Sequence, residues 1–296
     1  MQVQSDQEFF IQWHLTERCN LRCAHCYQES SNHLELSTAE ALALISETAE
    51  TMAAWAEQYH ISFLPSFNIT GGEPFLRQDL FTLLETLTSQ QFKIHLLTNG
   101  TLIDGVLAGR LKACGVAGVQ DSLEGPEPVH DAIRGQGSFR QAVAGIRHLL
   151  QAELRVTVNM TLSRLNADCV EEMLGLAADL GVQRLGFSRL IPSGRGKALL
   201  PEALDKHQIR HLYEKAFSLE TKGVELVSGD PTASRDLAAI TDDRGEVPFG
   251  GCAAGVSGLT VLPDGTVLPC RRLPLPLGNI RRDSIREIWA DSEILE

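Results

Sequence analysis

Apolar residues recur along the chain with two alternating periods. Short segments with a period near two are typical of strands, and longer segments with a period near 3.6 are typical of helices. The predicted strands cover residues 9–18, 66–72, 93–100, 118–125, 155–163 and 184–192. Each is followed by a predicted helix, at residues 37–59, 80–90, 102–115, 138–153, 167–181 and 203–223. Such alternation predicts an α/β fold with a parallel sheet and helices outside it.

These six strand–helix units fall short of the eight that close a barrel. We therefore expect a partial (β/α)6 barrel, with an open doubly wound sheet as the alternative. Because crossover connections are right-handed, the loops that follow the strands lie on one edge of the sheet. Ligands bind at that carboxyl-terminal edge in α/β proteins, so the functional residues are expected there.

The pattern changes after residue 223. Turn-forming residues dominate the next segment, and residues 259–269 then predict a β-hairpin around Pro263, Asp264 and Gly265. A short helix at 283–296 follows. We expect a barrel domain over residues 1–223 and a small module of β-hairpin plus helix over 224–296, either separate or capping the barrel.

The charge of the chain constrains its partners. The formal net charge is −12, and the densest arginine pairs, 271–272 and 281–282, form no basic block. We expect no nucleic-acid partner, because nucleic acids bind basic surfaces. No run of 18 apolar residues predicts a membrane span, and the first residues, MQVQSDQEFF, contain no export signal. The expected location is cytoplasmic.

Three of the seven cysteines are crowded into the stretch CNLRCAHCY, as Cys19, Cys23 and Cys26, with Tyr27 directly after them. Clustered cysteines in a reducing compartment indicate metal binding more often than disulfides, and thiolates suit zinc or iron–sulfur clusters. Structural zinc requires four protein ligands, and His25 lies between two of the cysteines, where a tight loop hardly lets it converge. A [4Fe–4S] cluster on three thiolates would leave one iron open to a small chelating molecule.

The C-x3-C-x2-C spacing followed by an aromatic residue resembles the radical S-adenosylmethionine superfamily, and ITGGEP at 69–74 resembles the GGE motif of that family. The resemblance implies that the three cysteines hold a [4Fe–4S] cluster. It also implies that backbone groups of Gly71 and Gly72 and the carboxylate of Glu73 meet the methionyl ammonium of S-adenosylmethionine. A plain turn with Pro74 at a helix start is the alternative for this segment.

The loops after the later strands resemble the family less tightly. DSLEG at 121–125 is similar to its fourth-strand turn, which implies a contact from Ser122 to the ribose or the carboxylate of S-adenosylmethionine. By the same resemblance Asn159 would reach the ribose, Arg189 the carboxylate, and Tyr27 the adenine. For each of these residues, a polar side chain satisfied within its own loop is an equal alternative.

Cys252 and Cys270 flank the predicted hairpin in a C-x12-G-x4-C pattern. This pattern resembles the start of a SPASM or twitch domain, in which such cysteines ligate an auxiliary [4Fe–4S] cluster. Full SPASM domains carry further cysteines beyond this point. The site is therefore expected to be incomplete, to be completed by another ligand or by substrate, or to require a C-terminal extension. Two free cysteines beside a turn are the remaining alternative.

The resemblance implies a radical enzyme. Its reduced cluster would cleave S-adenosylmethionine to a 5′-deoxyadenosyl radical that takes a hydrogen atom from substrate. Family members with SPASM or twitch domains act mostly on peptides or proteins, through thioether or carbon–carbon cross-links or side-chain oxidation, and this is the first prediction. Flavodoxin or ferredoxin would supply electrons.

Two alternatives remain for the function. One is side-chain decarboxylation of a tetrapyrrole haem precursor, and the other is a non-catalytic iron–sulfur or zinc protein. The sequence does not identify the acid or base that serves the substrate, although Glu35, Asp121, His130 and Asp230 are candidates.

Overall fold

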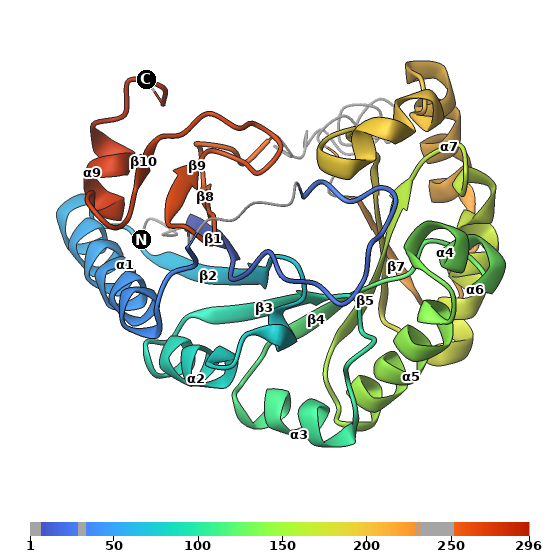
Figure 1. Cartoon of the computed structure of the whole chain (residues 1–296), viewed down its shortest axis with the longest axis horizontal. Helices are drawn as coiled ribbons and strands as arrows, with labels where there is room; N and C mark the ends of the chain where they lie inside the picture. Colours follow the sequence, from blue (N-terminus) through green and yellow to red (C-terminus); the bar gives the residue numbers. More distant parts are fainter. Residues whose placement is uncertain (1–6, 29–33, 229, 231–251, 296) are drawn as a thin grey trace, which may run out of the picture.

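A computed structural model of the chain describes residues 7–28, 34–228, 230 and 252–295. A single curved sheet of ten strands forms the inner wall, and helices cover its outer face (Figure 1). The strands are β1 (Gln7–His14), β2 (Phe63–Thr70), β3 (Lys93–Thr98), β4 (Gly118–Ser122), β5 (Val156–Leu162), β6 (Arg184–Arg189), β7 (Glu225–Ser228), β8 (Gly258–Val261), β9 (Thr266–Leu268) and β10 (Gly278–Asn279). The helices are α1 (Thr38–Tyr59), α2 (Leu80–Ser89), α3 (Gly105–Ala113), α4 (Glu127–Arg134), α5 (Ser138–Gln151), α6 (Val170–Leu180), α7 (Lys206–Ser218) and α9 (Ile285–Ala290).

Strands β1 to β7 pair in parallel with their sequence neighbours, so the predicted partial barrel is confirmed. The sheet remains open between β7 and β10, which are its two edge strands. Side chains alternate between the two faces of each strand. Those that point outward form the core beneath the helices, and Trp13, Phe67 and Leu96 among them are fully buried. The inward side chains are mostly polar, which makes the lumen a suitable place for chemistry.

The C-terminal hairpin continues this sheet. Strand β8 pairs in parallel with β1, with Phe10 opposite Gly258 and Trp13 opposite Val261. Helix α9 lies beside α1, where the Trp289 ring is 6.2 Å from the ring of Trp55. Strand β7 also lies beyond residue 223, and the domain boundary at that residue stays a prediction. Residues 231–251, which make up most of the turn-rich segment, lie outside the described residues.

Local signals explain where some helices begin. Ser37 and Glu40 form a reciprocal capping box at the start of α1, because each side chain accepts a hydrogen bond from the backbone N–H of the other residue. A similar box from Ser138 to Gln141 is a natural expectation, but it is wrong. The N-cap of α5 is Gly137, and the Ser138 hydroxyl donates to the Gly135 carbonyl at 2.6 Å. Among the described helices, none has the length and apolarity needed to cross a bilayer.

Candidate functional site

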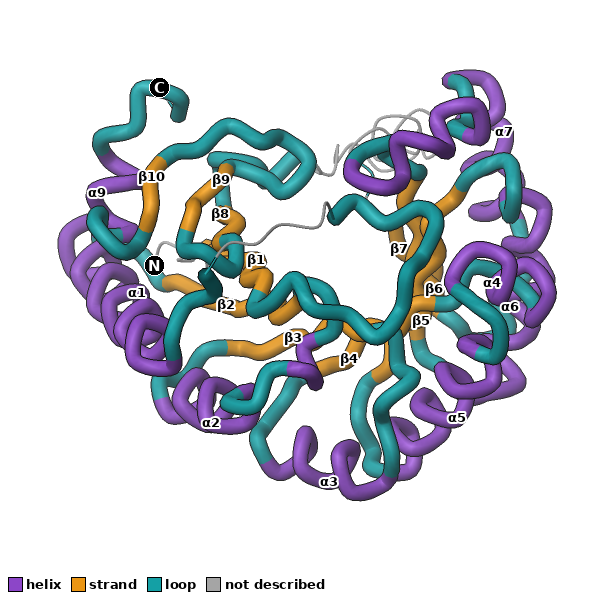
Figure 2. The backbone as a smooth tube through the Cα atoms, in the orientation of Figure 1, coloured by secondary structure: helices purple, strands orange, loops and turns teal. Residues whose placement is uncertain are grey.

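The three clustered cysteines lie on the loop that joins β1 to α1, and this loop passes in front of the strands in Figure 2. The backbone N–H of Leu21 donates to Cys19 Sγ at 3.4 Å, and the Asn99 side-chain amide approaches the same sulfur at 3.8 Å. The Gln28 backbone N–H donates to Cys26 Sγ at 3.5 Å. N–H groups around a metal-bound sulfur stabilise its negative charge, so these two positions are prepared for thiolate ligands.

The third sulfur, Cys23 Sγ, lies 3.8 Å from Arg134 Nη1, beside a buried ion pair. Two other guanidinium nitrogens of Arg134 donate to one oxygen of Glu124, at 2.6 and 2.9 Å. Burial opposes ionisation of Glu124, but Arg134 and His25 outweigh it and hold the pKa of Glu124 well below its usual range. His25 Nε2 lies 3.3 Å from the same carboxylate, so Glu124 engages this ring nitrogen.

The surroundings of the three thiols favour a cluster over free cysteines. Burial raises the pKa of Cys19 and Cys23, and the neighbouring thiols add to the rise. Three thiolates therefore need bound metal to remain together. Among the residues that the structure describes, no three His, Cys, Asp or Glu converge on one point as a single metal ion requires. A [4Fe–4S] cluster takes each thiolate on a different iron, so these residues fit it better than they fit zinc.

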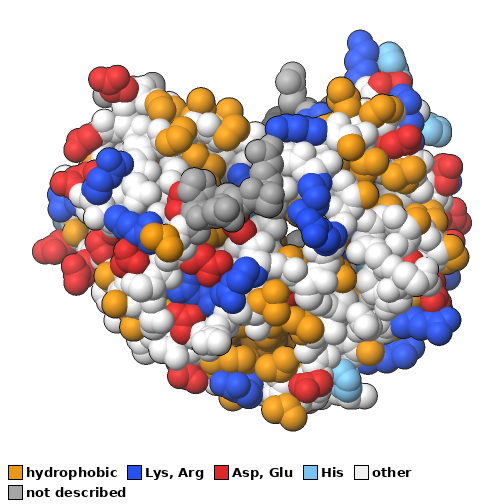
Figure 3. Space-filling model, in the orientation of Figure 1, with side chains coloured by type: hydrophobic (Ala, Val, Ile, Leu, Met, Phe, Trp, Pro, Cys, Tyr) orange, Lys and Arg blue, Asp and Glu red, His pale blue; other side chains and the backbone are white. Residues whose placement is uncertain are grey.

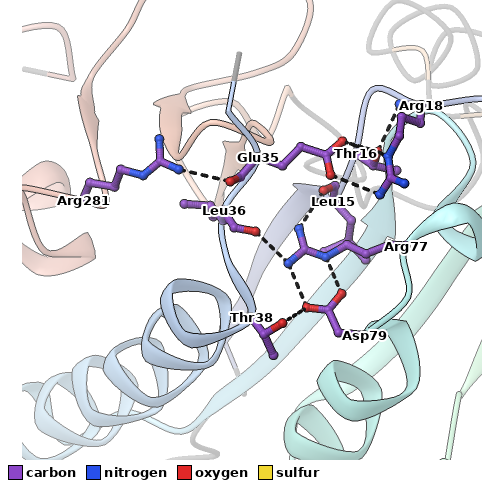
Figure 4. A network of polar contacts seen from close by, with 9 residues as sticks. All are labelled: Leu15, Thr16, Arg18, Glu35, Leu36, Thr38, Arg77, Asp79 and Arg281. Carbon is purple, nitrogen blue, oxygen red and sulfur yellow. Dashed lines mark hydrogen bonds and ion pairs between the residues drawn. The ribbon is translucent and has the colours of Figure 1, made fainter. Parts of the chain in front are cut away.

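Both ends of the cysteine loop are fixed by Arg77, which follows the GGEP segment (Figure 4). Its guanidinium donates to the Leu15 carbonyl at 3.0 Å, where the loop begins, and to the Leu36 carbonyl at 2.9 Å, where it ends. Asp79 binds Arg77 Nε at 2.6 Å and accepts the Thr38 hydroxyl at 2.7 Å. Since the Arg77 side chain is only 5% exposed, this arrangement holds the loop with little competition from water.

Glu35 joins a second set of contacts at the same place, also drawn in Figure 4. Its carboxylate accepts the Thr16 hydroxyl and lies 3.3 Å from Arg18 Nη2. Arg281, from the C-terminal module, donates to the Glu35 carbonyl at 3.2 Å and pairs with Glu40 at 2.7 Å. Glu35 therefore joins the cysteine loop to the C-terminal module, and its carboxylate is already engaged.

Gly71 and Gly72 allow β2 to pack directly against the start of the cysteine loop. The N–H of Gly72 donates to the Thr16 carbonyl at 2.7 Å, and that of Glu73 donates to the Arg18 carbonyl at 2.8 Å. A Cβ atom on Gly72 would lie 2.1 Å from the Arg18 carbonyl oxygen, and Gly71 has a φ of +134°. The glycines are thus required for contact between two chain segments. Their contact with S-adenosylmethionine stays a prediction.

The Glu73 carboxylate lies fully buried beneath this turn. It accepts hydrogen bonds from the Thr98 hydroxyl at 2.9 Å, from the Asn99 backbone N–H at 3.0 Å and from the Phe75 backbone N–H at 3.3 Å. Burial outweighs these bonds and raises the pKa of Glu73 to about 7. A nearby ammonium group would favour the ionised form, as the predicted contact requires.

Ser122 and Asn159 face each other across β4 and β5, where they are register partners on the half-buried side of the sheet. The Ser122 hydroxyl donates to the Thr98 carbonyl at 3.3 Å. Asp121 lies on the opposite face of β4, is fully buried, and has a pKa that burial raises well above its usual range. Ser122 and Asn159 therefore lie together as a ligand site requires, whereas Asp121 faces the helices.

Tyr27 and Arg189 both have protein partners. The Tyr27 hydroxyl donates to the Gly71 carbonyl at 3.5 Å, and its ring lies edge-on to His14 at 5.7 Å. Arg189 Nε lies 2.7 Å from Asp230 Oδ2. Tyr27 thus links the cysteine loop to the glycine turn, and Arg189 is held at the end of β6. Contacts from these side chains to adenine and to a carboxylate stay predictions.

Cys252 and Cys270 lie near one end of the hairpin. If the pairing of β8 with β9 is continued by two residues, Cys270 lies opposite Gly258. Gly258 also forms a β-bridge with Ala254, which is two residues after Cys252. Cys252 is exposed and Cys270 is half-buried. The Arg272 backbone N–H donates to Cys270 Sγ at 3.4 Å. The two sulfurs are not in disulfides and could contribute two ligands to an auxiliary cluster.

The segment after Cys270 crosses the mouth of the barrel, which the sequence did not indicate. The Arg271 guanidinium lies 5.4 Å from the centre of the Tyr27 ring, and Arg272 Nη2 lies 3.5 Å from the Ser188 hydroxyl on β6. Within the described part of the chain, neither arginine has an ion pair with a carboxylate. Figure 3 shows Lys and Arg side chains near the centre of the face drawn.

Family models match two parts of the chain. Residues 13–177 match the radical SAM superfamily, and residues 252–296 match the SPASM iron–sulfur cluster-binding domain. The AdoMet-dependent heme synthase of Methanosarcina barkeri is 30% identical, over 96% of this chain and 82% of the relative. The mycofactocin maturase MftC of Mycolicibacterium smegmatis is 32% identical, over 98% of this chain and 72% of the relative.

Solved structures share the fold at lower sequence identity. Streptococcus suis SuiB bound to its precursor peptide SuiA has a TM-score of 0.77 and 15% identity, over 98% of this chain and 66% of SuiB. Native anSMEcpe with bound AdoMet has a TM-score of 0.74 and 18% identity, over 97% of this chain and 81% of that structure. These likenesses support the partial-barrel fold with its C-terminal hairpin module.

Proposed function

Because this chain belongs to the radical S-adenosylmethionine superfamily, we propose that it takes a hydrogen atom from a peptide or protein and so modifies it. Its cofactors are a [4Fe–4S] cluster and S-adenosylmethionine, and the SPASM region brings an auxiliary iron–sulfur site. The bound cofactors supply a 5′-deoxyadenosyl radical after one-electron reduction. The observation that carries the proposal is the cysteine loop, in which all three sulfurs face N–H groups and both loop ends are fixed by Arg77.

The residues of this chain would divide the work as follows. Cys19, Cys23 and Cys26 would hold the cluster, and the turn at Glu73 would receive the amino group of S-adenosylmethionine. Ser122 and Asn159 would bind the polar edge of its ribose from the lumen, with Tyr27 and Arg189 as further contacts. A polar lumen closed on the outside by helices would exclude competing hydrogen donors. Flavodoxin or ferredoxin is the proposed electron donor.

The peptide substrate is supported by the relatives. Mycofactocin maturase is named as a maturase, and SuiB shares the fold in a complex with a precursor peptide. We propose a cross-link of the thioether or carbon–carbon type, or a side-chain oxidation, as the modification.

A second substrate class is favoured by Arg271 and Arg272. These two cations lie at the barrel mouth and have no carboxylate partner in the described part of the chain. They are therefore suited to bind substrate carboxylates, and propionate-bearing tetrapyrroles carry several carboxylates. The heme synthase and the Fe-coproporphyrin III synthase of Methanosarcina barkeri are relatives at 30% and 28% identity. Decarboxylation of a haem precursor is therefore the second candidate function.

One experiment separates the two candidates. The reconstituted protein is incubated without oxygen with S-adenosylmethionine, a reductant and either a candidate precursor peptide or a propionate-bearing tetrapyrrole, and the products are analysed by mass spectrometry. A mass change in the peptide supports the first candidate, whereas loss of carbon dioxide from the tetrapyrrole supports the second. If 5′-deoxyadenosine is never released under any condition, both are wrong.

The contact of Arg271 and Arg272 with substrate carboxylates can be tested by mutation. Replacing both Arg271 and Arg272 by Gln should raise the KM for a carboxylate-rich substrate on the order of tenfold, because two charge-assisted contacts are lost. Substrate-independent release of 5′-deoxyadenosine should hardly change. The matched control is Arg147→Gln with Arg286→Gln, which removes two exposed charges elsewhere. An equal change of KM in the control would contradict a specific contact.

A further inference from the structure

We propose that the amino-terminal end of the barrel lumen binds a small anion that carries a phosphate or a carboxylate group. A cavity of about 310 Å³ lies where strands β3, β4 and β6 begin and β5 is about to begin. The cysteine loop follows the opposite, carboxyl-terminal end of β1. This chamber therefore lies deeper in the lumen than Ser122 and Asn159, which follow its lining residues Gln120 and Thr157 by two positions on the same faces of β4 and β5, and nothing in the proposed function depends on it.

Three cations line the chamber and no acidic residue does. Arg184 is paired with Glu225, with Nε 2.8 Å from the carboxylate. Lys93 and Arg155 are exposed at the rim and have no ion pair with any described residue. On a chain with a net charge of −12, three cations beside the one rim carboxylate of Glu225, which also lies within electrostatic reach of Arg155, make a local positive potential.

Neutral hydrogen-bond donors lie deeper in the same chamber. Gln12, Asn68, His95 and Gln120 line it from β1, β2, β3 and β4, and no hydrogen bond joins these side chains to another described residue. Burial, and then the charges of the nearby Lys and Arg residues, lower the pKa of His95. The imidazole is therefore neutral at physiological pH and offers one N–H.

Cations at the rim with amide and imidazole donors inside match the needs of an oxyanion. A phosphate or carboxylate has several acceptor lone pairs, and charge-assisted bonds from Lys and Arg would supply most of the affinity. The side-chain amides would donate hydrogen bonds to the anion in place of those that it receives from water in solution. A chamber filled only by water is the competing account, and it predicts no saturable binding of either anion.

The test measures binding of inorganic phosphate and, separately, of succinate to the full reconstituted chain by calorimetry at low ionic strength. We expect saturable binding of at least one probe, and weaker binding as salt is added. Binding of phosphate alone assigns a phosphorylated ligand, and binding of succinate alone assigns a carboxylate. Saturable binding of neither probe overturns the proposal.

Three variants locate the binding. Lys93→Gln with Arg155→Gln should weaken it on the order of tenfold or more. Gln120→Leu, which changes no charge, should weaken it several-fold because one donor is lost. The control pair Arg147→Gln with Lys206→Gln removes two exposed charges elsewhere and should bind like the parent. Unchanged affinity in the first pair, or an equal loss in the control pair, contradicts the site. Release of 5′-deoxyadenosine is measured in parallel, so failure of the proposed function is recognised separately.

Discussion

The two cysteine-bearing regions of this molecule differ in how the surrounding chain holds their sulfur atoms. Cys19, Cys23 and Cys26 receive N–H groups from their own loop and from two other parts of the chain, Asn99 after β3 and Arg134 on α4. Within the described residues, Cys252 and Cys270 have one such contact, from the backbone of the neighbouring Arg272. The first region is organised by the barrel, whereas the second depends on a single hairpin.

The difference indicates which region can bind its cluster without help. A metal site is as rigid as the residues that orient its ligands. The loop of Cys19 is fixed at both ends by a buried arginine, but Cys252 is exposed and lies directly after residues outside the described part. We expect the first site to bind its cluster independently, and the second to need further ligands.

The largest expected effect comes from removing the cysteines of each region in turn. Replacing Cys19, Cys23 and Cys26 by Ala should abolish 5′-deoxyadenosine release and lower the iron content by about four per chain. Replacing Cys252 and Cys270 by Ala should leave the release largely intact but stop turnover of substrate. Chromatography measures the released 5′-deoxyadenosine, and iron analysis measures the iron content per chain. Full release from the triple variant would refute the assignment of the cluster.

The next effect comes from the buried arginine of the first region. Arg77→Met leaves two carbonyls and Asp79 without their partner, and should lower the free energy of unfolding by about 3 kcal/mol. The matched control is Arg140→Gln, because the Arg140 side chain is 79% exposed in its pair with Glu127 and should cost less than about 1 kcal/mol. Urea denaturation measures both. Similar losses in the two variants would show that Arg77 does not fix the loop.

Glu73 should make stability depend on pH. Its pKa rises from 4.5 to about 7 on folding, because of burial. As pH rises through this window, the unfolded chain gives up the proton while the folded chain keeps it, so the unfolded state is favoured and stability falls. The loss is on the order of 3 kcal/mol once both forms are ionised.

Glu73→Gln keeps the hydrogen-bond acceptor and removes the titration. From pH 4.5 to about 7, the parent should therefore lose unfolding free energy that the variant keeps, so the variant becomes progressively more stable than the parent. Urea denaturation at several pH values, without S-adenosylmethionine, measures this difference. A constant difference over the whole range would mean that the carboxyl group titrates normally in the folded protein.

The smallest expected effect concerns Tyr27. Tyr27→Phe removes the hydroxyl, which bonds the Gly71 carbonyl at 3.5 Å and the Thr70 side chain, and should change the affinity for S-adenosylmethionine by about twofold at most. Tyr27→Ala removes the ring and should weaken binding on the order of tenfold. Calorimetry on the reconstituted protein compares the two. Equal losses would contradict the predicted packing of the ring on adenine.

Much of the fold follows from the period of apolar residues. All six predicted barrel strands are present, because each carries an alternating segment long enough to bury one face. Helix α4 was missed, since its eight residues begin after Pro126 and carry few apolar positions. The pairing of β8 with β1 could not be predicted either, because register between distant strands depends on tertiary packing.

The site was predictable where residue type and spacing decide the chemistry. The three cysteines and the GGEP turn are of this kind. Arg77 and Arg134 were not, because their partners Leu15 and Cys23 lie 62 and 111 positions away in the sequence. Such side chains resemble ordinary surface arginines until the fold brings their partners together. The glycines show a related limit, since their motif was recognised but their contact with Thr16 and Arg18 was not.

The central claim is that the first cysteine region leaves one iron open to S-adenosylmethionine. Electron paramagnetic resonance of the anaerobically reduced Cys252→Ala, Cys270→Ala variant tests it most directly, because only the cluster of Cys19, Cys23 and Cys26 should remain. We predict a [4Fe–4S]⁺ signal that shifts when S-adenosylmethionine is added. A signal that S-adenosylmethionine leaves unchanged, or the absence of any such cluster, would contradict the account.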